Sequence, residues 1–184
     1  MKKQVPMNLV TLGFSANESQ DESLVGLLLA CHTRIRRFAR LALTVGARPE
    51  LPAAEVKEAC RQCLRYFTEA LPLHVRDEED SLWPRLAHKS AALDATLAQM
   101  RAQHFGHVSR LAALQIALES VLARPGEPTL HRQLAAAAST LETDFEEHLA
   151  LEETELFPFL ETALRAEDRE AIVEELRARR RPPS

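Results

Sequence analysis

Apolar residues recur at spacings of three and four along most of this chain, which is the period of an amphipathic α-helix. The first such segment runs from about Ser23 to Val45, and Gly46 then has the residue type that commonly ends a helix. A second segment begins after Pro52, since proline is favoured at the first position of a helix. Pro72 lies inside this second segment, so we expect a kink or a break near it.

Two further long segments follow. The third has the cleanest apolar stripe, from Leu93 to Leu118, and ends at "ARPGEP", which contains glycine and two prolines. The fourth runs from about Thr129 to Ala163, and "EDREAIVEELRARR" forms a last short helix. Long amphipathic helices with short loops predict an all-α fold, an up-down-up-down four-helix bundle with a short C-terminal helix. We expect an N-terminal arm (1–21), the bundle (22–180) and a C-terminal tail (181–184).

Histidines interrupt the apolar stripes of all four long helices. In the second and fourth helices a glutamate follows the histidine four residues later, so both side chains project from the same side of the helix. These polar positions are His32, His74, Glu78, His104, His148 and Glu152. At about 1.5 Å per residue, the histidines of the last three helices return to one level of the bundle, whereas His32 fits that level less well.

Imidazole and carboxylate groups gathered in a bundle interior are typical of a metal site. Carboxylates can bridge two ions while imidazoles bind each of them, so the set suits a dinuclear centre. Mixed nitrogen and oxygen ligands suit iron, manganese or zinc, and the residue types alone do not choose among them. The alternative is that each histidine is an ordinary hydrogen-bonded core residue. Because so many buried polar groups would be costly without a metal, we favour the metal site.

The second and fourth helices contain the same phrase. "HVRDEEDSLWP" begins at His74 and "HLALEETELFP" at His148, each with an aromatic residue nine positions on and a proline ten positions on. We interpret the pairs Trp83-Pro84 and Phe157-Pro158 as packing and helix-shaping elements. Acidic residues adjoin the candidate ligands, and we expect one of them to accept a hydrogen bond from an imidazole N–H: Glu79, Asp80, Glu153 or Glu155.

These residues resemble the hemerythrin-like, or HHE cation-binding, domain family. The matching stretches are "LLLACHTRIR", "YFTEALPLHVRDEEDSLWP", "MRAQHFGHVSRL" and "FEEHLALEETELFP", and the resemblance covers about residues 22–180. It implies a four-helix bundle with two iron ions in a non-haem di-iron centre, for which zinc or manganese are substitutes. By position, it implies His32 and His74 on one iron, His104 and His148 on the other, and Glu78 and Glu152 as bridges.

The chain departs from the invertebrate oxygen carriers of that family in two places. Those proteins have an aspartate where this chain has Glu152, and a second histidine at i+4 in the third helix, where the nearest residue here is His107 at i+3. His107 faces the predicted core and is therefore a candidate fifth histidine ligand, an outer partner of the ligands or a core residue. With four histidines alone, both irons keep an open position, which suits reaction or sensing as well as carriage.

Composition narrows the functional classes. The net charge of −4 argues against a general nucleic-acid binder, and no apolar run approaches the roughly 20 residues of a membrane span. Three cysteines are too few for a disulfide scaffold, which favours the cytoplasm, and we interpret the Cys60–Cys63 CxxC motif as small core residues. We expect His131, at a helix start, to be exposed and the basic run "RARRR" to form a solvated surface.

No general acid, nucleophile or substrate pocket is legible, so the sequence favours a binding protein over an enzyme. We expect a cytoplasmic hemerythrin-like protein whose di-iron centre binds or senses O2 or a related small molecule. Two alternatives stay open: a di-iron enzyme acting on peroxide or nitric oxide, and iron storage or delivery to damaged iron centres. The expected partner is a small molecule such as O2, without nucleic acid or membrane, and a homodimer or an unknown protein partner is also open.

Overall fold

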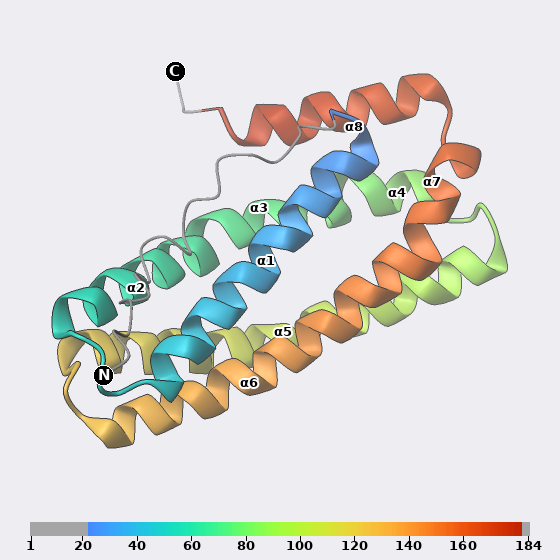
Figure 1. Ribbon diagram of the computed structural model, residues 1–184. Helices are drawn as coiled ribbons and strands as arrows, with labels where there is room; N and C mark the ends of the chain where they lie inside the picture. Colours follow the sequence, from blue (N-terminus) through green and yellow to red (C-terminus); the bar gives the residue numbers. More distant parts are fainter. Residues whose placement is uncertain (1–21, 182–184) are drawn as a thin grey trace, which may run out of the picture.

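The computed structural model describes residues 22–181, and in this range every regular element is helical. The all-α bundle predicted from the sequence is therefore confirmed (Figure 1). The arm at 1–21 and residues 182–184 of the tail lie outside the described residues. The elements are α1 (Leu24–Ala47), α2 (Ala53–Arg65), η2 (Tyr66–Ala70), α3 (Leu71–Arg76), η3 (Asp77–Leu82), α4 (Trp83–Leu86), α5 (Ala91–Ala123), α6 (Pro128–Leu151), η4 (Glu152–Leu156), α7 (Phe157–Ala163) and α8 (Ala166–Arg179).

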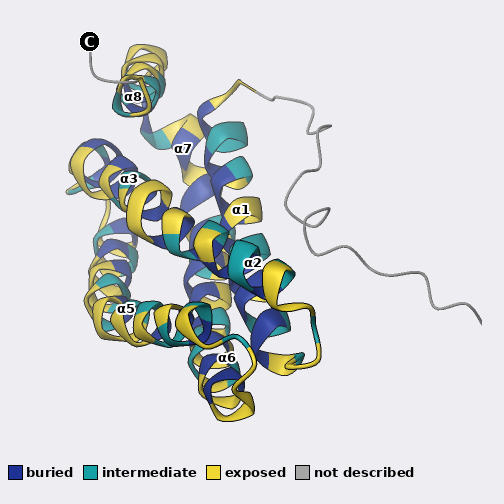
Figure 2. Cartoon of the chain, turned by 90° about the vertical axis from the view of Figure 1, so that its left-hand side faces the viewer, coloured by how far each residue is buried: buried dark blue, intermediate teal, exposed yellow. Residues whose placement is uncertain are grey.

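The long helices lie side by side and are joined by short loops (Figure 1). Helix α6 packs against both α1 and α5, and α2 also contacts α1 and α5. Helix α8 follows the bundle and packs on η3 and α1. Figure 2 shows that buried residues follow the inward faces of these helices, as the amphipathic pattern requires. None of the helices in the described range is long and apolar enough to cross a membrane.

Three π-helical segments occur in the predicted second and fourth helices, and each one precedes a proline. Pro72, Pro84 and Pro158 lie two residues after the ends of η2, η3 and η4, respectively. Proline has no N–H to donate, and in an α-helix its ring collides with the carbonyl of residue i−4. A π-turn, with hydrogen bonds from i to i+5, widens the preceding turn and relieves this conflict. The second helix therefore continues through Pro72 instead of breaking there.

The interior contains two apolar clusters separated by a polar layer. One cluster packs α2 and η2 against the C-terminal parts of α1 and α5 and against α6, and it includes Phe67, Leu118 and Leu141. The other packs the N-terminal parts of α1 and α5 against α4, α7 and α8, and it includes Trp83 and Met100. Each long helix passes from one cluster to the other, and the interrupting histidines and glutamates lie between them. The buried motif cysteines belong to the first cluster, as expected of small core residues.

Helix termini agree with the sequence at one end of α1 and differ at the other. The Ser23 hydroxyl accepts a hydrogen bond from the Gly26 N–H at 3.0 Å and so caps the helix. Gly46, expected to end the helix, instead lies inside it with a negative φ. A Cβ atom at Gly46 would collide with the backbone of Ala135, so glycine is required because α1 and α6 approach closely there.

The expected exposure of His131 is wrong. Its ring is fully buried, and its two nitrogens lie 2.8 Å from the carbonyl oxygens of Val45 and Pro125. Val45 is in the last turn of α1, where carbonyl groups lack partners inside the helix. His131 thus directs its ring N–H at a main-chain acceptor and joins the start of α6 to the end of α1.

The expectation of a solvated basic run is wrong for Arg179, and the exposed Arg180 also pairs with a buried carboxylate. Arg179 and Arg180 form ion pairs at 2.9 and 2.5 Å with Asp77, whose side chain is 0% exposed. Asp77 begins η3, so these pairs attach the end of α8 to the segment that carries Glu78. A buried charge is costly unless it is paired. Two arginines of the basic run therefore serve as partners of the buried Asp77 carboxylate.

Candidate metal centre

The polar layer brings together all six candidate ligands from the sequence. The side chains of these residues are buried or nearly so, including His104 at 9% exposure. Their potential ligand atoms form two groups, and within each group these atoms lie within 4.8 Å of one another. The first group is His32, His74, Glu78 and Glu152, and the second is Glu78, His104 and His148.

The Glu78 carboxylate connects the two groups. Its Oε1 atom lies 2.7 Å from Nε2 of His74, and its Oε2 atom lies 3.0 Å from Nε2 of His104. The carboxylate is 1% exposed, so water does not solvate these oxygens. Each oxygen of Glu78 therefore faces a different pair of histidines.

Glu152 repeats this arrangement from the fourth helix. Its Oε2 atom lies 2.8 Å from Nε2 of His32, and its Oε1 atom lies 3.3 Å from Nε2 of His148. His32 therefore joins the layer, although helix lengths placed it at a different level. Two carboxylates that each present one oxygen to either side have the arrangement needed to bridge two ions.

Apart from Nε2 of His104 and Nε2 of His148, which lie 3.0 Å apart, the atoms that converge in this layer do not satisfy one another by hydrogen bonding. Both oxygens of Glu78 and of Glu152, and Nε2 of His32 and of His74, are buried without hydrogen-bond partners. Their short separations lack the donor–acceptor alignment of a hydrogen bond. Unsatisfied buried polar atoms are costly, whereas a cation uses their lone pairs directly. The nitrogen and oxygen donors therefore fit metal ions.

The outer nitrogens of two histidines are held by glutamates. Nδ1 of His32 lies 2.7 Å from Oε1 of Glu153, and Nδ1 of His104 lies 2.8 Å from Oε1 of Glu79. Such a hydrogen bond fixes the tautomer with the proton on Nδ1 and leaves the lone pair of Nε2 directed into the layer. Two of the four acidic residues considered from the sequence thus have the expected position.

The other two acidic residues do not contact the layer's histidines. Asp80 pairs with Arg76 at 3.0 Å, and Glu155 is exposed. Sequence reasoning also missed Gln103, whose Oε1 lies 3.0 Å from Nδ1 of His148. The residue before His104 gives no periodic signal of this role, because Gln103 acts across the α5–α6 contact and not along its own helix.

Aromatic residues of the repeated phrase pack on the same two histidines. The Trp83 ring lies 4.9 Å from that of His104, and the Phe157 ring stacks on His32 at 5.2 Å. Each phrase therefore supplies an inward glutamate, then a glutamate and an aromatic residue for a histidine of another helix. This common set of contacts explains why the chain contains the phrase twice, and it supports the packing interpretation of the aromatic residues.

Electrostatics favour ionised carboxylate in the layer. Burial opposes charge on Glu78, but the charge of His74 and the close imidazoles of His104 and His148 outweigh it and hold the pKa of Glu78 well below its usual value. Burial likewise opposes charge on His74, yet Glu78 raises the pKa of His74 well above that of a free imidazole. Since metal ions bind carboxylate and neutral imidazole, binding would release protons from the histidines.

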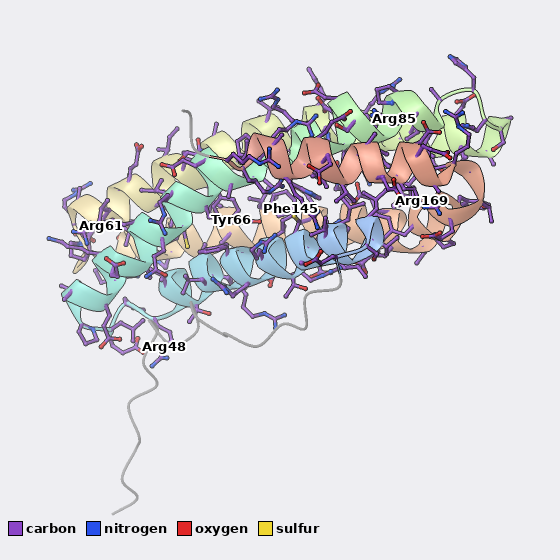
Figure 3. All side chains as sticks on the ribbon, turned by 90° about the horizontal axis from the view of Figure 1, so that it is seen from above. Arg48, Arg61, Tyr66, Arg85, Phe145 and Arg169 are labelled. Carbon is purple, nitrogen blue, oxygen red and sulfur yellow. The ribbon has the colours of Figure 1, made fainter. Side chains whose placement is uncertain are left out.

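His107 is buried but belongs to neither group of ligand atoms. Its ring lies 5.3 Å from that of His148 and 5.2 Å from that of Phe145, which is labelled in the bundle interior in Figure 3. Burial, then the charges of His148 and His104, lower the pKa of His107 to about 4. This position favours an outer role, and direct ligation by His107 stays a prediction.

A cavity of about 380 Å³ adjoins the layer. Rings of His74, His104 and His148 line it on one side, and Phe105 and Val108 of α5 line it near the surface. The sequence offered no sign of a pocket, because its walls come from all four long helices of the bundle, which are distant along the chain.

Comparison with known proteins agrees with the geometry. The family model of the hemerythrin HHE cation-binding domain matches residues 23–160, which include every residue of the polar layer. A protein from Haemophilus influenzae, described only as uncharacterized, is 28% identical over 100 residues, which are 53% of this chain and 58% of that protein. The chain thus spans somewhat more than half the length of this relative. Because the family match covers most of the chain, the chain belongs to the hemerythrin HHE cation-binding domain family.

Proposed function

We propose that this protein holds a non-haem di-iron centre that binds or senses O2 or a related small molecule. The proposal depends above all on the two buried carboxylates, each with one oxygen directed to either pair of histidines. One ion would be held by His32 and His74, the other by His104 and His148, with Glu78 and Glu152 as bridges.

Iron is our choice among the metals that such ligands accept. Imidazole and carboxylate ligands suit iron. A thiolate ligand would favour zinc or copper(I), and the two groups of ligand atoms contain none. Bound iron would supply a redox-active ion with an open position. Zinc or manganese are substitutes that the same donors accept.

The protein's own residues support binding of a small molecule. Glu79, Glu153 and Gln103 orient the imidazoles, and the two apolar clusters close the layer above and below. His107 lies outside both groups of ligand atoms. Each proposed ion would therefore have two histidines and the two bridging glutamates as protein ligands, which leaves room for a small molecule. The adjoining cavity offers a path by which a small molecule reaches the layer from the surface.

We further propose that the protein acts in the cytoplasm as a binding protein. The three cysteines are free, as in a reducing compartment. Turnover of peroxide or nitric oxide, and iron storage or delivery, are the functions against which this proposal is tested.

Elemental analysis of protein purified without added metal is the first test, and we expect two iron ions per chain. The protein loaded with ferrous iron in the absence of air is then exposed to O2 while the visible spectrum is followed. A coloured adduct that disappears under vacuum supports binding or sensing. Irreversible oxidation with peroxide or nitric oxide turnover supports an enzyme instead, and rapid transfer of iron to a chelator supports iron handling.

Variants make this test specific to the layer. Glu78→Gln and Glu152→Gln remove the proposed bridging charges, and each should lower the iron content. Glu155→Gln is the matched control, because Glu155 is exposed near Glu152 and contacts none of the histidines. A folded wild-type protein that takes up no iron, manganese or zinc would refute the proposed centre.

A further inference from the structure

The cavity beside the histidine layer is larger than a diatomic gas needs. It measures about 380 Å³ and is lined by residues of α1, α3, η3, α5 and α6. One water molecule occupies about 30 Å³ of the liquid, and an apolar cavity of about 150 Å³ binds benzene. Pockets that bind drug-sized organic ligands measure about 300–1,000 Å³. The volume therefore corresponds to an organic molecule larger than benzene.

The walls of this cavity are mainly apolar. Aliphatic and aromatic side chains form most of its lining, and the polar side consists chiefly of the histidine rings. At the opening, Phe105 is 85% exposed and Val108 is 67% exposed. Exposed aromatic and aliphatic groups at the mouth of a cavity lose contact with water when a hydrocarbon occupies it, and this favours binding.

The charged groups at the cavity are of both signs, and the lining residue His74, whose pKa is raised, is paired with the Glu78 carboxylate at 2.7 Å. Arg101 and Glu79 are the lining residues with full opposite charges. The Arg101 guanidinium lies 5.6 Å from the Trp83 ring and makes no ion pair within the described residues, and the Glu79 carboxylate lies 2.8 Å from Nδ1 of His104. A ligand with a net charge would be attracted by one of these groups and repelled by the other. An uncharged ligand avoids that repulsion.

We infer that this cavity binds an uncharged apolar organic molecule with one polar end, of the class of medium-chain alcohols. Its hydrocarbon part would lie against Phe105, Val108 and Leu111, and its polar end would face the rings of His104 and His107. The inference rests on the proposed function only in placing this molecule beside the proposed iron centre. Binding itself depends on the cavity.

Calorimetric titration with 1-butanol, 1-hexanol and 1-octanol tests this inference. We expect one site per chain and an affinity that rises about fourfold with each added methylene group, the factor that corresponds to burial of a CH₂. Octanoate has the same chain length with a negative charge, and we expect it to bind at least tenfold more weakly than octanol. Octanoate binding as tightly as octanol would overturn the assignment to uncharged ligands.

Val108→Trp should obstruct the opening and weaken octanol binding at least tenfold. Because Val108 is 67% exposed, the larger side chain has room and the fold should be retained, which the melting curve checks. Ile116→Trp is the matched control, since Ile116 is 64% exposed on the same helix and does not line the cavity. Phe105→Ser is a second variant that removes apolar surface without adding bulk, and it should also weaken binding.

The outcomes separate the two proposals. No alcohol binding by a folded protein with normal iron content overturns this inference and leaves the iron centre standing. Alcohol binding of equal strength in Val108→Trp and the wild type also overturns it, because the alcohol would then bind elsewhere. Normal alcohol binding by a protein that takes up no metal would refute the iron centre while retaining the cavity as a ligand site.

Discussion

Nδ1 of His32 lies 2.7 Å from Oε1 of Glu153, although the two residues are 121 positions apart in the sequence. Glu79 has the same relationship to His104. In each repeated phrase, the first glutamate enters the layer while the second holds the histidine of another helix. The two glutamates of each phrase lie in one π-helical segment, η3 in the first phrase and η4 in the second. The wider turn of a π-helix changes the directions of successive side chains.

Removal of this outer hydrogen bond should weaken metal binding. We expect Glu153→Ala to lower metal affinity about 10–100-fold, because His32 would lose the group that sets its tautomer and orientation. Competition against a chelator of known affinity measures the change. Glu155→Ala removes an exposed glutamate two positions away and should leave the affinity unchanged. Equal affinities in all three proteins would show that Glu153 does not orient the ligand.

Two glycine substitutions should change stability in opposite directions. Gly46→Ala should lower the free energy of unfolding by about 1–3 kcal/mol, because the methyl group meets the backbone of Ala135, which cannot rotate away. Gly106→Ala should raise it by about 0.5–1 kcal/mol, since Gly106 is inside α5 and an added Cβ meets no atom within 4 Å. Urea denaturation measures both, and destabilisation of similar size in the two variants would contradict the prediction.

Removal of Arg179 and Arg180, which attach α8, should destabilise the protein more than removal of their partner Asp77. The double variant Arg179→Ala, Arg180→Ala should lose about 3–5 kcal/mol of unfolding free energy, because Asp77 is left buried and unpaired. Asp77→Asn should cost less, about 1–3 kcal/mol, since the arginine side chains are 14% and 34% exposed and can reach water.

Denaturation curves with the same metal content compare these variants. The control is Arg177→Ala, Arg181→Ala, whose ion pairs are at the surface and should contribute within about 1 kcal/mol. If Asp77→Asn lowered the free energy of unfolding as much as the loss of both arginines, the difference in burial between Asp77 and the arginines would not explain the stability of this contact.

His107 should make the metal-free protein sensitive to acid. Its pKa is lowered to about 4 by burial and by the charges of His148 and His104, so the folded state resists protonation. The unfolded chain binds this proton as the pH falls through about 6.5, and stability therefore decreases from about pH 6.5 to about pH 4. His107→Leu should reduce this loss by about 1–3 kcal/mol, allowing for partial solvent screening.

Urea denaturation at pH 7 and pH 4 measures the difference in stability for each protein. Metal-free samples are required because metal release is itself dependent on pH. His88→Leu is the control, since the His88 side chain is 94% exposed. An identical pH dependence in the wild type and in His107→Leu would mean that His107 takes up its proton as readily when folded.

Local periodicity was sufficient to predict the helical bundle and the residues of its polar layer. Positions four residues apart share one side of a helix wherever that helix packs, so His74 with Glu78 and His148 with Glu152 were legible before the fold was known. Proline positions likewise indicated where the helices depart from α geometry.

The position of His32 was predicted less well, because the level at which one helix meets another depends on loops and on the angle of packing. The burial of His131 and the pairing of Asp77 with the end of α8 have the same origin: each depends on which main-chain or charged group lies opposite. Sequence periodicity identifies the inward side of a helix but not its neighbour.

The sequence by itself determined the helices, the inward faces on which polar groups interrupt the core, and the repeated phrase, because these follow from the residue order and from the fixed rise and rotation of an α-helix. Only the tertiary structure decided which oxygen faces which histidine, that Glu153 serves His32, and that a cavity opens beside His104. Contacts across helices are set by side-chain packing between segments far apart in the chain, and no local spacing encodes them.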